Sequence, residues 1–327
     1  VTPNGFEDDF VWNGREFDEK RAEARRAMIR TAEATLSCKF DGEPLIVGTS
    51  GRYEFRNKGI DIFLDALKQL AETDALDREV LVYITVPSAT TGPRKDLQAH
   101  LADENSPIDP KQNRFCTHYL EHPEWDQILN SIAGSVLANP SSKVKVVFVP
   151  TYLNGRDGIF DKSYYELLVG MDMTLFPSYY EPWGYTPLES TAFSVPTLTT
   201  TLAGFGLWAG SQGEHEGVTL VARNDDNYAE AAREIAKALL HFTKYTPQEV
   251  EIARNAAAEL SRTALWSELY AAYEKAYSEA IERSVTRTNR AVLNDGGGAT
   301  EQINFVRQQL ITEKPHWNRV MVEKVLP

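Results

Sequence analysis

The chain has 327 residues, 42% of them hydrophobic, which is enough to form a full hydrophobic core. Its formal net charge of -13 argues against nucleic acid or an anionic membrane as the main partner, and no apolar run is long enough to cross a membrane. Cys38 and Cys116 are too few for a disulfide framework or a zinc cluster, so we expect a reducing, cytoplasmic location and no metal.

Apolar residues alternate between helical and strand-like spacing along most of the chain. In chain order, the pattern predicts a helix over 16–37, a strand over 45–49, a polar loop over 51–59, a helix over 60–71 and a strand over 80–86. After a polar, irregular stretch over 87–121, it predicts a helix over 125–138, a strand over 144–149, a helix over 163–170, a strand over 174–176, a helix over 186–193 and a strand over 197–200. Long helices over 228–242 and 247–283 follow, then a linker over 291–299 and a short helix over 300–312.

Regular alternation of strands and helices predicts an α/β fold, a doubly wound parallel sheet flanked by helices. We expect one domain over 1–290, with a linker and C-terminal tail over 291–327. In such sheets the ligand binds at the carboxyl ends of the strands. The richest motifs of this sequence follow the strands that end near Thr49, Val149 and Phe176.

The segment from Phe176 to Glu189 places two carboxylates, several aromatic residues and a glycine at a strand-to-helix junction. Glu181 and Glu189 flank the start of the helix, where free N–H groups and a partial positive charge suit a diphosphate. Gly184 lets the main chain approach such a ligand closely, and carboxylate oxygens suit sugar hydroxyls. We interpret the segment as a sugar-nucleotide site. The alternative is a proline-rich surface loop with scattered acidic residues.

The loop from Thr49 to Gly59 carries two spaced cations, Arg52 and Lys58. Arginine offers a rigid fork to phosphate oxygens and lysine a compact charge, so the two could stabilise a departing nucleoside diphosphate without metal. Taken alone, the loop is equally compatible with a solvated basic turn, because short basic loops are common.

Weaker signals lie elsewhere. Tyr152 and Tyr164, near strand ends, offer aromatic faces for a base, although each alone is more typical of half-buried packing. The run from Leu202 to Trp208, with two glycines, is either a phosphate loop or a tight turn. For His118 a structural hydrogen bond is favoured over acid-base chemistry.

Three stretches together resemble the animal and fungal type of glycogen synthase, a retaining glycosyltransferase with two facing Rossmann-like domains: Gly51 to Gly59, Phe176 to Glu189 and Thr199 to Gly206. They occur in the family's order, and the likeness runs from about Asn4 to about Tyr270. It implies that the chain is the nucleotide-binding half of a two-domain GT-B glycosyltransferase. The implied donor is UDP-glucose, the implied acceptor is the non-reducing end of glycogen or another α-1,4-glucan, and no cofactor is implied.

The resemblance also implies roles for individual residues. Arg52 and Lys58 would clamp the donor diphosphate, and Glu181 would contact the donor sugar beside the reacting carbon. The donor-binding residues would be Tyr152 and Tyr164 at the uracil, Glu189 at the ribose, and the main chain of Gly184, Tyr185 and Thr186 at the phosphates. Trp183, in the same segment, would also belong to the donor site. With no obvious protein nucleophile, the leaving phosphate itself could accept the proton of the acceptor, so that positioning and electrostatics supply the catalysis.

Three departures from the family limit these expectations. Only the family's second domain matches, so we expect the chain alone to be inactive or nearly so. The range 248–262 holds only Arg254 and Arg262 where the family has an arginine-rich helix, so activation by glucose 6-phosphate is not expected. The stretch 87–118 is shorter than the family's assembly insertion, which leaves an oligomer open without implying the family's tetramer. Alternative functions are another retaining GT-B transferase that uses a nucleotide sugar, or a non-catalytic nucleotide or glucan sensor.

Overall fold

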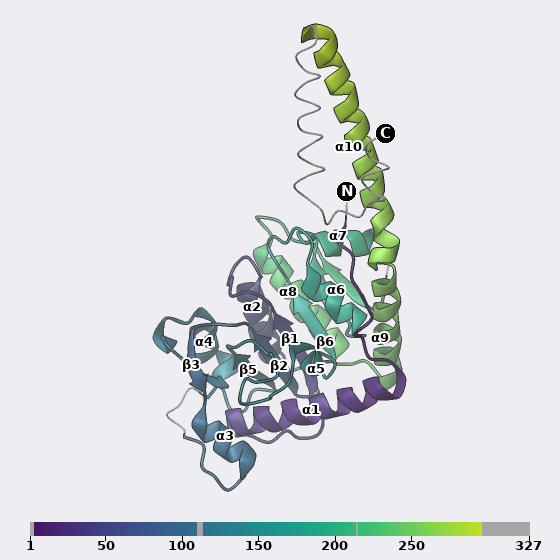
Figure 1. Ribbon diagram of the computed structural model, residues 1–327. Coiled ribbons are helices and arrows are strands. Elements are labelled where there is room, and N and C mark those ends of the chain that lie inside the picture. Colours follow the sequence, from purple (N-terminus) through teal and green to yellow (C-terminus); the bar gives the residue numbers. More distant parts are fainter. Residues whose placement is uncertain (1–2, 110–113, 214, 296–327) are drawn as a thin grey trace. The chain divides into compact units, whose positions relative to one another are not determined.

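The computed structural model describes residues 3–109, 114–213 and 215–295, and the chain forms two compact units that divide after Trp266. The first unit, Pro3–Trp266, is built on a six-stranded sheet in the order β5-β2-β1-β6-β7-β8, with every pair parallel (Figure 1). Its strands are β1 (Leu45–Ser50), β2 (Val80–Thr85), β5 (Val144–Val149), β6 (Met173–Phe176), β7 (Thr197–Thr200) and β8 (Val218–Val221). The predicted doubly wound parallel fold is confirmed.

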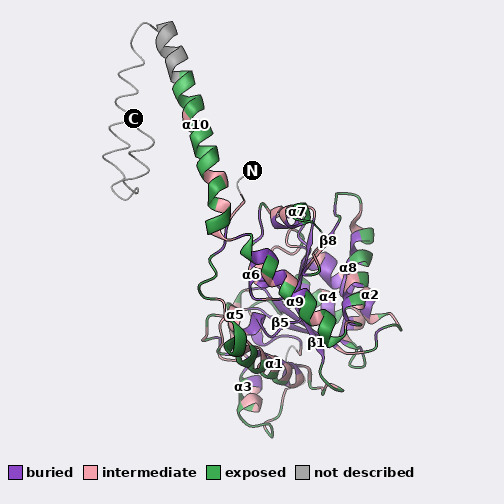
Figure 2. Ribbon diagram, turned by 90° about the vertical axis from the view of Figure 1, so that its right-hand side faces the viewer, coloured by how far each residue is buried: buried purple, intermediate pink, exposed green. Residues whose placement is uncertain are grey.

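Helices cover both faces of this sheet. They are α1 (Gly14–Leu36), α2 (Ile60–Ala71), α3 (Lys95–Ala102), α4 (Gln127–Ala133), α5 (Tyr164–Leu168), α6 (Tyr185–Ala192), α7 (Gly204–Ser211), α8 (Tyr228–Phe242) and α9 (Pro247–Arg262). Leu45 and Val47 of β1 point into a core shared with α2, α4 and α8, whereas Ile46 between them joins α1 and α5 on the other face. Figure 2 shows the buried residues gathered on the strands and on the inward sides of the helices. A strand buried on both faces is a continuous apolar run, which is why the sequence shows these strands clearly.

The strand order fixes where a ligand can bind. The chain winds from β1 through β2 to β5 on one side and from β6 through β7 to β8 on the other, so β1 and β6 are neighbours at the point where the winding reverses. In sheets of this kind the crevice lies at the carboxyl ends of the two strands at this switch point. The loops that begin after Ser50 and Phe176 therefore share one edge of the sheet.

The stretch 87–121, predicted to be irregular, contains a small antiparallel sheet and a helix. The strands β3 (Thr90–Pro93) and β4 (His118–Leu120) pair with each other, and α3 lies between them in the chain. Arg94 is fully buried and donates hydrogen bonds to Asp96 and to the Cys116 carbonyl. The prediction that this stretch has no regular structure was wrong. A buried cation stabilises the region, and it has no periodic apolar face that a sequence pattern could reveal.

Two predicted helices are interrupted. The helix expected over 125–138 is α4 between two short 3-10 turns, η1 (Pro123–Trp125) and η2 (Val136–Ala138), with Gly134 ending α4. The helix expected over 247–283 breaks after α9, where the main chain of Phe6 bonds the Ala264 carbonyl at 3.0 Å and the Trp266 amide at 3.1 Å. This N-terminal segment is remote in sequence, so local periodicity could not predict the break.

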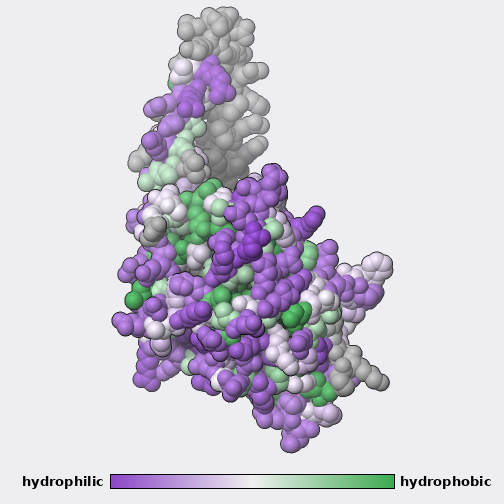
Figure 3. All heavy atoms as spheres, turned by 180° about the vertical axis from the view of Figure 1, so that it is seen from behind, coloured by the Kyte–Doolittle hydropathy of each residue, from purple (hydrophilic) through white to green (hydrophobic). Residues whose placement is uncertain are grey.

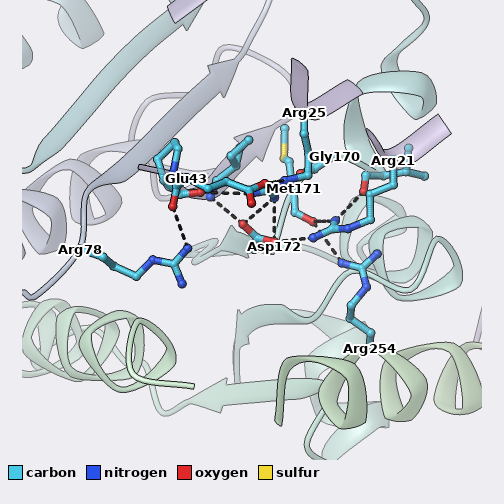
Figure 4. Close-up of polar contacts among 11 residues, drawn as sticks. Arg21, Arg25, Glu43, Arg78, Gly170, Met171, Asp172 and Arg254 are labelled. Carbon is cyan, nitrogen blue, oxygen red and sulfur yellow. Dashed lines mark hydrogen bonds and ion pairs between the residues drawn. The ribbon is translucent and has the colours of Figure 1, made fainter. Parts of the chain in front are cut away.

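A cluster of charged residues joins α1 to the start of β6 (Figure 4). The buried carboxylate of Asp172 accepts from Arg25 Nη1 at 2.8 Å and Arg21 Nη2 at 2.5 Å, and from the Ile46 amide at 2.8 Å. Arg254 of α9 donates to the neighbouring Met171 carbonyl at 3.3 Å. Burial alone would raise the pKa of Asp172, but the charges of Arg25 and Arg21 hold it below its ordinary value. The cluster lies at the amino end of β6, opposite the edge where the motif loops meet.

The second unit includes all but the first residue of α10 (Trp266–Asp295), a 30-residue helix. On α10, Tyr270, Tyr277 and Val285 are exposed. The predicted linker over 291–299 is helical as far as Asp295, so α10 crosses the predicted boundary at 290. The rest of that linker and the predicted helix over 300–312 lie outside the described residues.

The surface seen from behind is mostly hydrophilic, with hydrophobic side chains in limited areas (Figure 3). Within the described residues, none of the helices combines the length and the apolar character that crossing a bilayer requires.

Candidate active site

A pocket of about 340 Å³ opens at the carboxyl ends of the central strands. Its lining comes from the carboxyl ends of β1 and β2, the loops after β1, β2 and β5, α5 and the first turns of α6. The lining residues are Ser50, Gly51, Arg52, Tyr53, Thr85, Pro87, Thr151, Tyr152, Leu153, Tyr164, Thr186 and Glu189. The structure thus brings together five of the residues predicted from sequence: Arg52, Tyr152, Tyr164, Thr186 and Glu189.

Lys58 and Glu181, the other two predicted catalytic residues, form an ion pair with each other. Lys58 comes from the loop after β1 and Glu181 from the loop after β6, and both side chains are mostly buried, at 17% and 20% exposed. Since β1 and β6 are hydrogen-bonded neighbours, the pair bridges the two loops at the switch point of the sheet.

Close backbone packing fixes the position of Lys58. The next residue, Gly59, has φ +69°, and a Cβ there would lie 1.9 Å from the Pro177 carbonyl oxygen, so only glycine fits. The amide of Tyr179 donates to the Asn57 carbonyl at 2.8 Å. The loop after β1 and the loop after β6 are therefore held together on both sides of Lys58.

Arg223, which the sequence did not single out, supports the same contact. It is buried just after β8, donates to the Pro177 carbonyl and lies over the Tyr179 ring, 5.2 Å from its centroid. Burial lowers the pKa of its guanidinium. Because β8 itself was not predicted, no sequence signal placed this arginine beside the loop after β6.

The backbone of Glu181 is held by the start of α7. The Glu181 amide donates to the Leu202 carbonyl at 3.2 Å, and its carbonyl accepts from the Gly204 amide at 2.9 Å. A Cβ on Gly204 would lie 2.2 Å from the Pro182 oxygen, and one on Gly206 would lie 2.4 Å from the Thr200 oxygen. The glycine run is therefore not a tight turn but the start of α7, which packs closely on the loop after β6. Its possible role as a phosphate loop stays a prediction.

Arg52 lines the pocket but its side chain is 76% exposed, and it pairs with Glu54 at 3.0 Å. Tyr152 is also largely exposed at the rim. Both lie where a ligand could contact them, and their predicted roles stay predictions.

Tyr164 and Glu189 form the less exposed wall of the pocket. The Tyr164 hydroxyl and Ser50 Oγ are 2.7 Å apart, and burial raises the Tyr164 pKa. Burial also raises the pKa of Glu189, while a hydrogen bond from the Tyr165 hydroxyl, at 3.1 Å, opposes that rise. Sequence reasoning missed Ser50 and Tyr165, although Tyr165 adjoins a residue that it did select.

The remaining predicted donor-binding residues surround the start of α6. Gly184 caps the helix with φ +109°, and Tyr185, its first residue, is 46% exposed. The Trp183 side chain is buried among the rings of Phe205 and Trp208, with centroids 6.2 and 6.0 Å away. The indole thus packs against α7, and donor contact by Trp183 stays a prediction.

His118 has the structural surroundings that the sequence favoured. It is buried and its ring nitrogens lie 2.9 Å from Thr117 Oγ1 and 2.9 Å from the Asp157 carbonyl. In the part of the chain that the structure describes, His, Cys, Asp and Glu side chains form no group of three or more that could hold a metal ion.

Two solved structures show partial similarity to the chain. A glycosyltransferase from Rickettsia africae has a TM-score of 0.47 at 14% identity, covering 85% of this chain and 56% of its own. The HepE protein of Anabaena, in complex with UDP, has a TM-score of 0.47 at 15% identity, covering 84% of this chain and 56% of its own.

Curated relatives have higher identity. Glycogen [starch] synthase of Neurospora crassa is 28% identical over 305 residues, covering 75% of this chain and 43% of the relative. The Caenorhabditis elegans enzyme is 28% identical over 292 residues, covering 72% and 43%, and the human liver enzyme is 28% identical over 296 residues, covering 73% and 42%. The chain spans less than half the length of these relatives.

The glycogen synthase family model matches residues 94–324. This range includes the loop after β6 and the Glu181 and Glu189 carboxylates, and it begins after Arg52 and Lys58. It spans more than half of the chain, which therefore belongs to the glycogen synthase family.

Proposed function

We propose that the chain is the donor-binding half of a retaining glucosyltransferase that moves glucose from UDP-glucose to the non-reducing end of an α-1,4-glucan. The observation that carries this proposal is the meeting of two loops at the β1/β6 switch point. The Lys58–Glu181 pair joins these loops at the same edge of the sheet as the pocket lined by Tyr164 and Glu189. Membership of the glycogen synthase family supports the choice of donor and acceptor.

Each group in this site has a chemical use. The Lys58 ammonium and the Arg52 guanidinium offset the negative charge that grows on the leaving diphosphate, so no metal is needed for that step. Tyr164 presents its ring to the uracil. Glu189 accepts hydrogen bonds from the ribose hydroxyls, and Glu181 accepts from the glucose hydroxyls beside the reacting carbon.

The transfer itself exchanges one bond for another. The bond from glucose C1 to the phosphate oxygen breaks, a bond from C1 to the acceptor's 4-hydroxyl oxygen forms on the same face, and the hydroxyl proton passes to the departing phosphate. UDP leaves with that proton. The protein's contribution is to hold the acceptor hydroxyl and the leaving phosphate on the same face of the sugar and to stabilise the leaving group.

The relatives are more than twice as long as the matched part of this chain, and we propose that a second GT-B domain supplies the acceptor side of the cleft. We also propose a cytoplasmic location, which the two free cysteines, Cys38 and Cys116, support.

One assay tests the proposal. The chain is joined to an N-terminal half like that of its longer relatives. It is incubated with glycogen or a small sugar as acceptor and with either UDP-glucose or ADP-glucose, with and without EDTA. Glucose incorporation from UDP-glucose that EDTA does not reduce is the expected result. Absence of incorporation from both donors, with UDP still bound, would favour a sensor, and transfer to a small sugar instead of glycogen would favour another transferase.

A further inference from the structure

Tyr165 is placed to orient Glu189 without lining the pocket. Its hydroxyl donates to Glu189 Oε1 at 3.1 Å, and Tyr165 is absent from the pocket lining to which its neighbour Tyr164 belongs. Glu189 Oε2 accepts no hydrogen bond from the described residues. One oxygen of this carboxylate is thus held by the protein, while the other is available to a ligand.

The phenol ring of Tyr165 is fixed by the same helix that carries Glu189. It stacks on Phe193 with the centroids 4.9 Å apart and the planes at 11°, and Phe10 packs on it at 5.2 Å. Phe193 is fully buried at the C-terminal end of α6, and its amide donates to the Glu189 carbonyl at 3.0 Å. Ring and carboxylate are therefore set against one another by one rigid element.

The start of α5 is equally well defined. Ser163 and Glu166 form a capping box, with the Ser163 amide donating to Glu166 Oε2 at 2.9 Å. This cap fixes the first turn of the helix, which contains Tyr165. The hydroxyl consequently has little freedom to leave the carboxylate.

The charge states suit a lasting hydrogen bond. Burial and the neighbouring Glu189 charge raise the pKa of Tyr165 to about 12, so the hydroxyl keeps its proton near neutral pH. Burial raises the pKa of Glu189, and the bond from Tyr165 opposes this by stabilising the carboxylate. Without the phenol, the carboxylate would be both less restrained and less readily ionised.

We propose that Tyr165 is a positioning residue that holds Glu189 Oε1, turns Oε2 toward the ribose hydroxyls of the donor nucleotide, and so makes the pocket select ribonucleotides. The inference rests on the proposed function for the pocket and adds to it the residue that sets sugar selectivity.

Tyr165→Phe tests the proposal because it removes the hydroxyl and keeps the ring. Binding of UDP and of 2′,3′-dideoxy-UDP to the 327-residue chain is measured by calorimetry. In the wild type, UDP should bind more tightly than the dideoxy analogue. The variant should lose roughly threefold to tenfold in UDP affinity, the range of one net hydrogen bond, with little change for the analogue.

Two controls separate positioning from general damage. Tyr228→Phe removes a similar, partly buried bond between α8 and α2, from a Tyr hydroxyl to Asp65 at 2.8 Å, and it should leave both affinities unchanged. In a Glu189→Ala background, Tyr165→Phe should have no further effect on the ratio of the two affinities, because the group it positions is gone.

The outcomes are distinct. A wild type that does not bind UDP would overturn the proposed function and, with it, this inference. A wild type that prefers UDP, together with a Tyr165→Phe variant that keeps the full preference, would overturn the inference alone. Equal losses for both nucleotides would also overturn it, since they would indicate a packing role.

Discussion

Lys58 and Glu181 neutralise each other across the two loops at the centre of the sheet. In the free protein, the cation expected to meet the diphosphate is thus already paired with the carboxylate expected to meet the sugar. A bound donor has to share or replace that contact, and the predictions for the two residues follow from this competition.

Glu181→Gln should tighten UDP binding while it slows glucose transfer. The substitution frees Lys58 and removes a negative charge near the phosphates, so we expect roughly threefold to tenfold higher affinity, which is reduced by added salt. Calorimetry at low and high salt checks this. Glu234→Gln, which breaks a surface pair with Lys237 at 2.7 Å, is the matched control. Weaker UDP binding by Glu181→Gln would contradict the competition.

Lys58→Ala should lower turnover far more than nucleotide affinity, because the ammonium balances charge that grows as the leaving group departs. Loss of such a group costs about a hundredfold or more in kcat. Steady-state kinetics of the two-domain protein, with UDP affinity measured alongside, provide the comparison. Lys68→Ala, which removes a pair with Asp65 on α2 at 2.9 Å, should leave both quantities near wild type. Equal losses in turnover and affinity would count against the role of Lys58.

Tyr164→Ala should weaken UDP binding by about 1 to 3 kcal/mol if the ring stacks on the base, by analogy with stacking on single-stranded nucleic acids. Tyr164→Phe keeps the ring and removes the hydroxyl, which contacts Ser50, so it should lose much less UDP affinity. Titration of both variants with UDP measures the difference. An unchanged dissociation constant in Tyr164→Ala would leave the residue with a packing role only.

Asp172→Asn should destabilise the fold by about 3 to 5 kcal/mol, because it leaves Arg21 and Arg25 partly buried without their carboxylate. Urea unfolding at neutral pH measures this. Asp74→Asn, at an exposed position on the surface, should change stability little. If Asp172→Asn lowers the unfolding free energy as little as Asp74→Asn does, the cluster contributes little to stability.

The Asp172 cluster also predicts a pH dependence. The pKa of Asp172 is lowered in the folded protein, so the unfolded chain binds the proton more readily. The stabilisation is fully present above the unfolded-state pKa of about 3.9 and is lost as the pH falls toward the folded-state value. The difference in unfolding free energy between wild type and Asp172→Asn should therefore shrink on acidification below about pH 4. A constant difference down to that range would be inconsistent with the ionised pair.

The sequence predicted the central strands well, and the physical reason is their burial. β1, β2 and β5 are mostly apolar and almost entirely buried, with helices on both faces, so their signal needs no tertiary information. The strand β8 was missed because it is short and only its last residue, Val221, is buried. The break after α9 was missed because it depends on Phe6, a residue that is far away in the chain.

The candidate site likewise contains residues that the sequence predicted and residues that it missed. Glu181, Glu189, Arg52 and Lys58 stood out because charged residues beside glycines at strand ends are conspicuous in the sequence. Tyr165 and Arg223 did not, since one looks like ordinary packing and the other follows an unpredicted strand. Their importance lies in what they touch, Glu189 and the Pro177 carbonyl, and such contacts emerge only from the folded chain.

The strand β6 has a charged group at each end, Asp172 where it begins and Glu181 in the loop beyond its end. The first is enclosed by arginines of α1, and the second faces the loop after β1. Substitutions around Asp172 should therefore change thermal stability without changing turnover. Substitutions around Glu181 should change turnover without lowering the stability of the fold. For an engineer, this strand separates the two properties that most often trade against each other in enzymes.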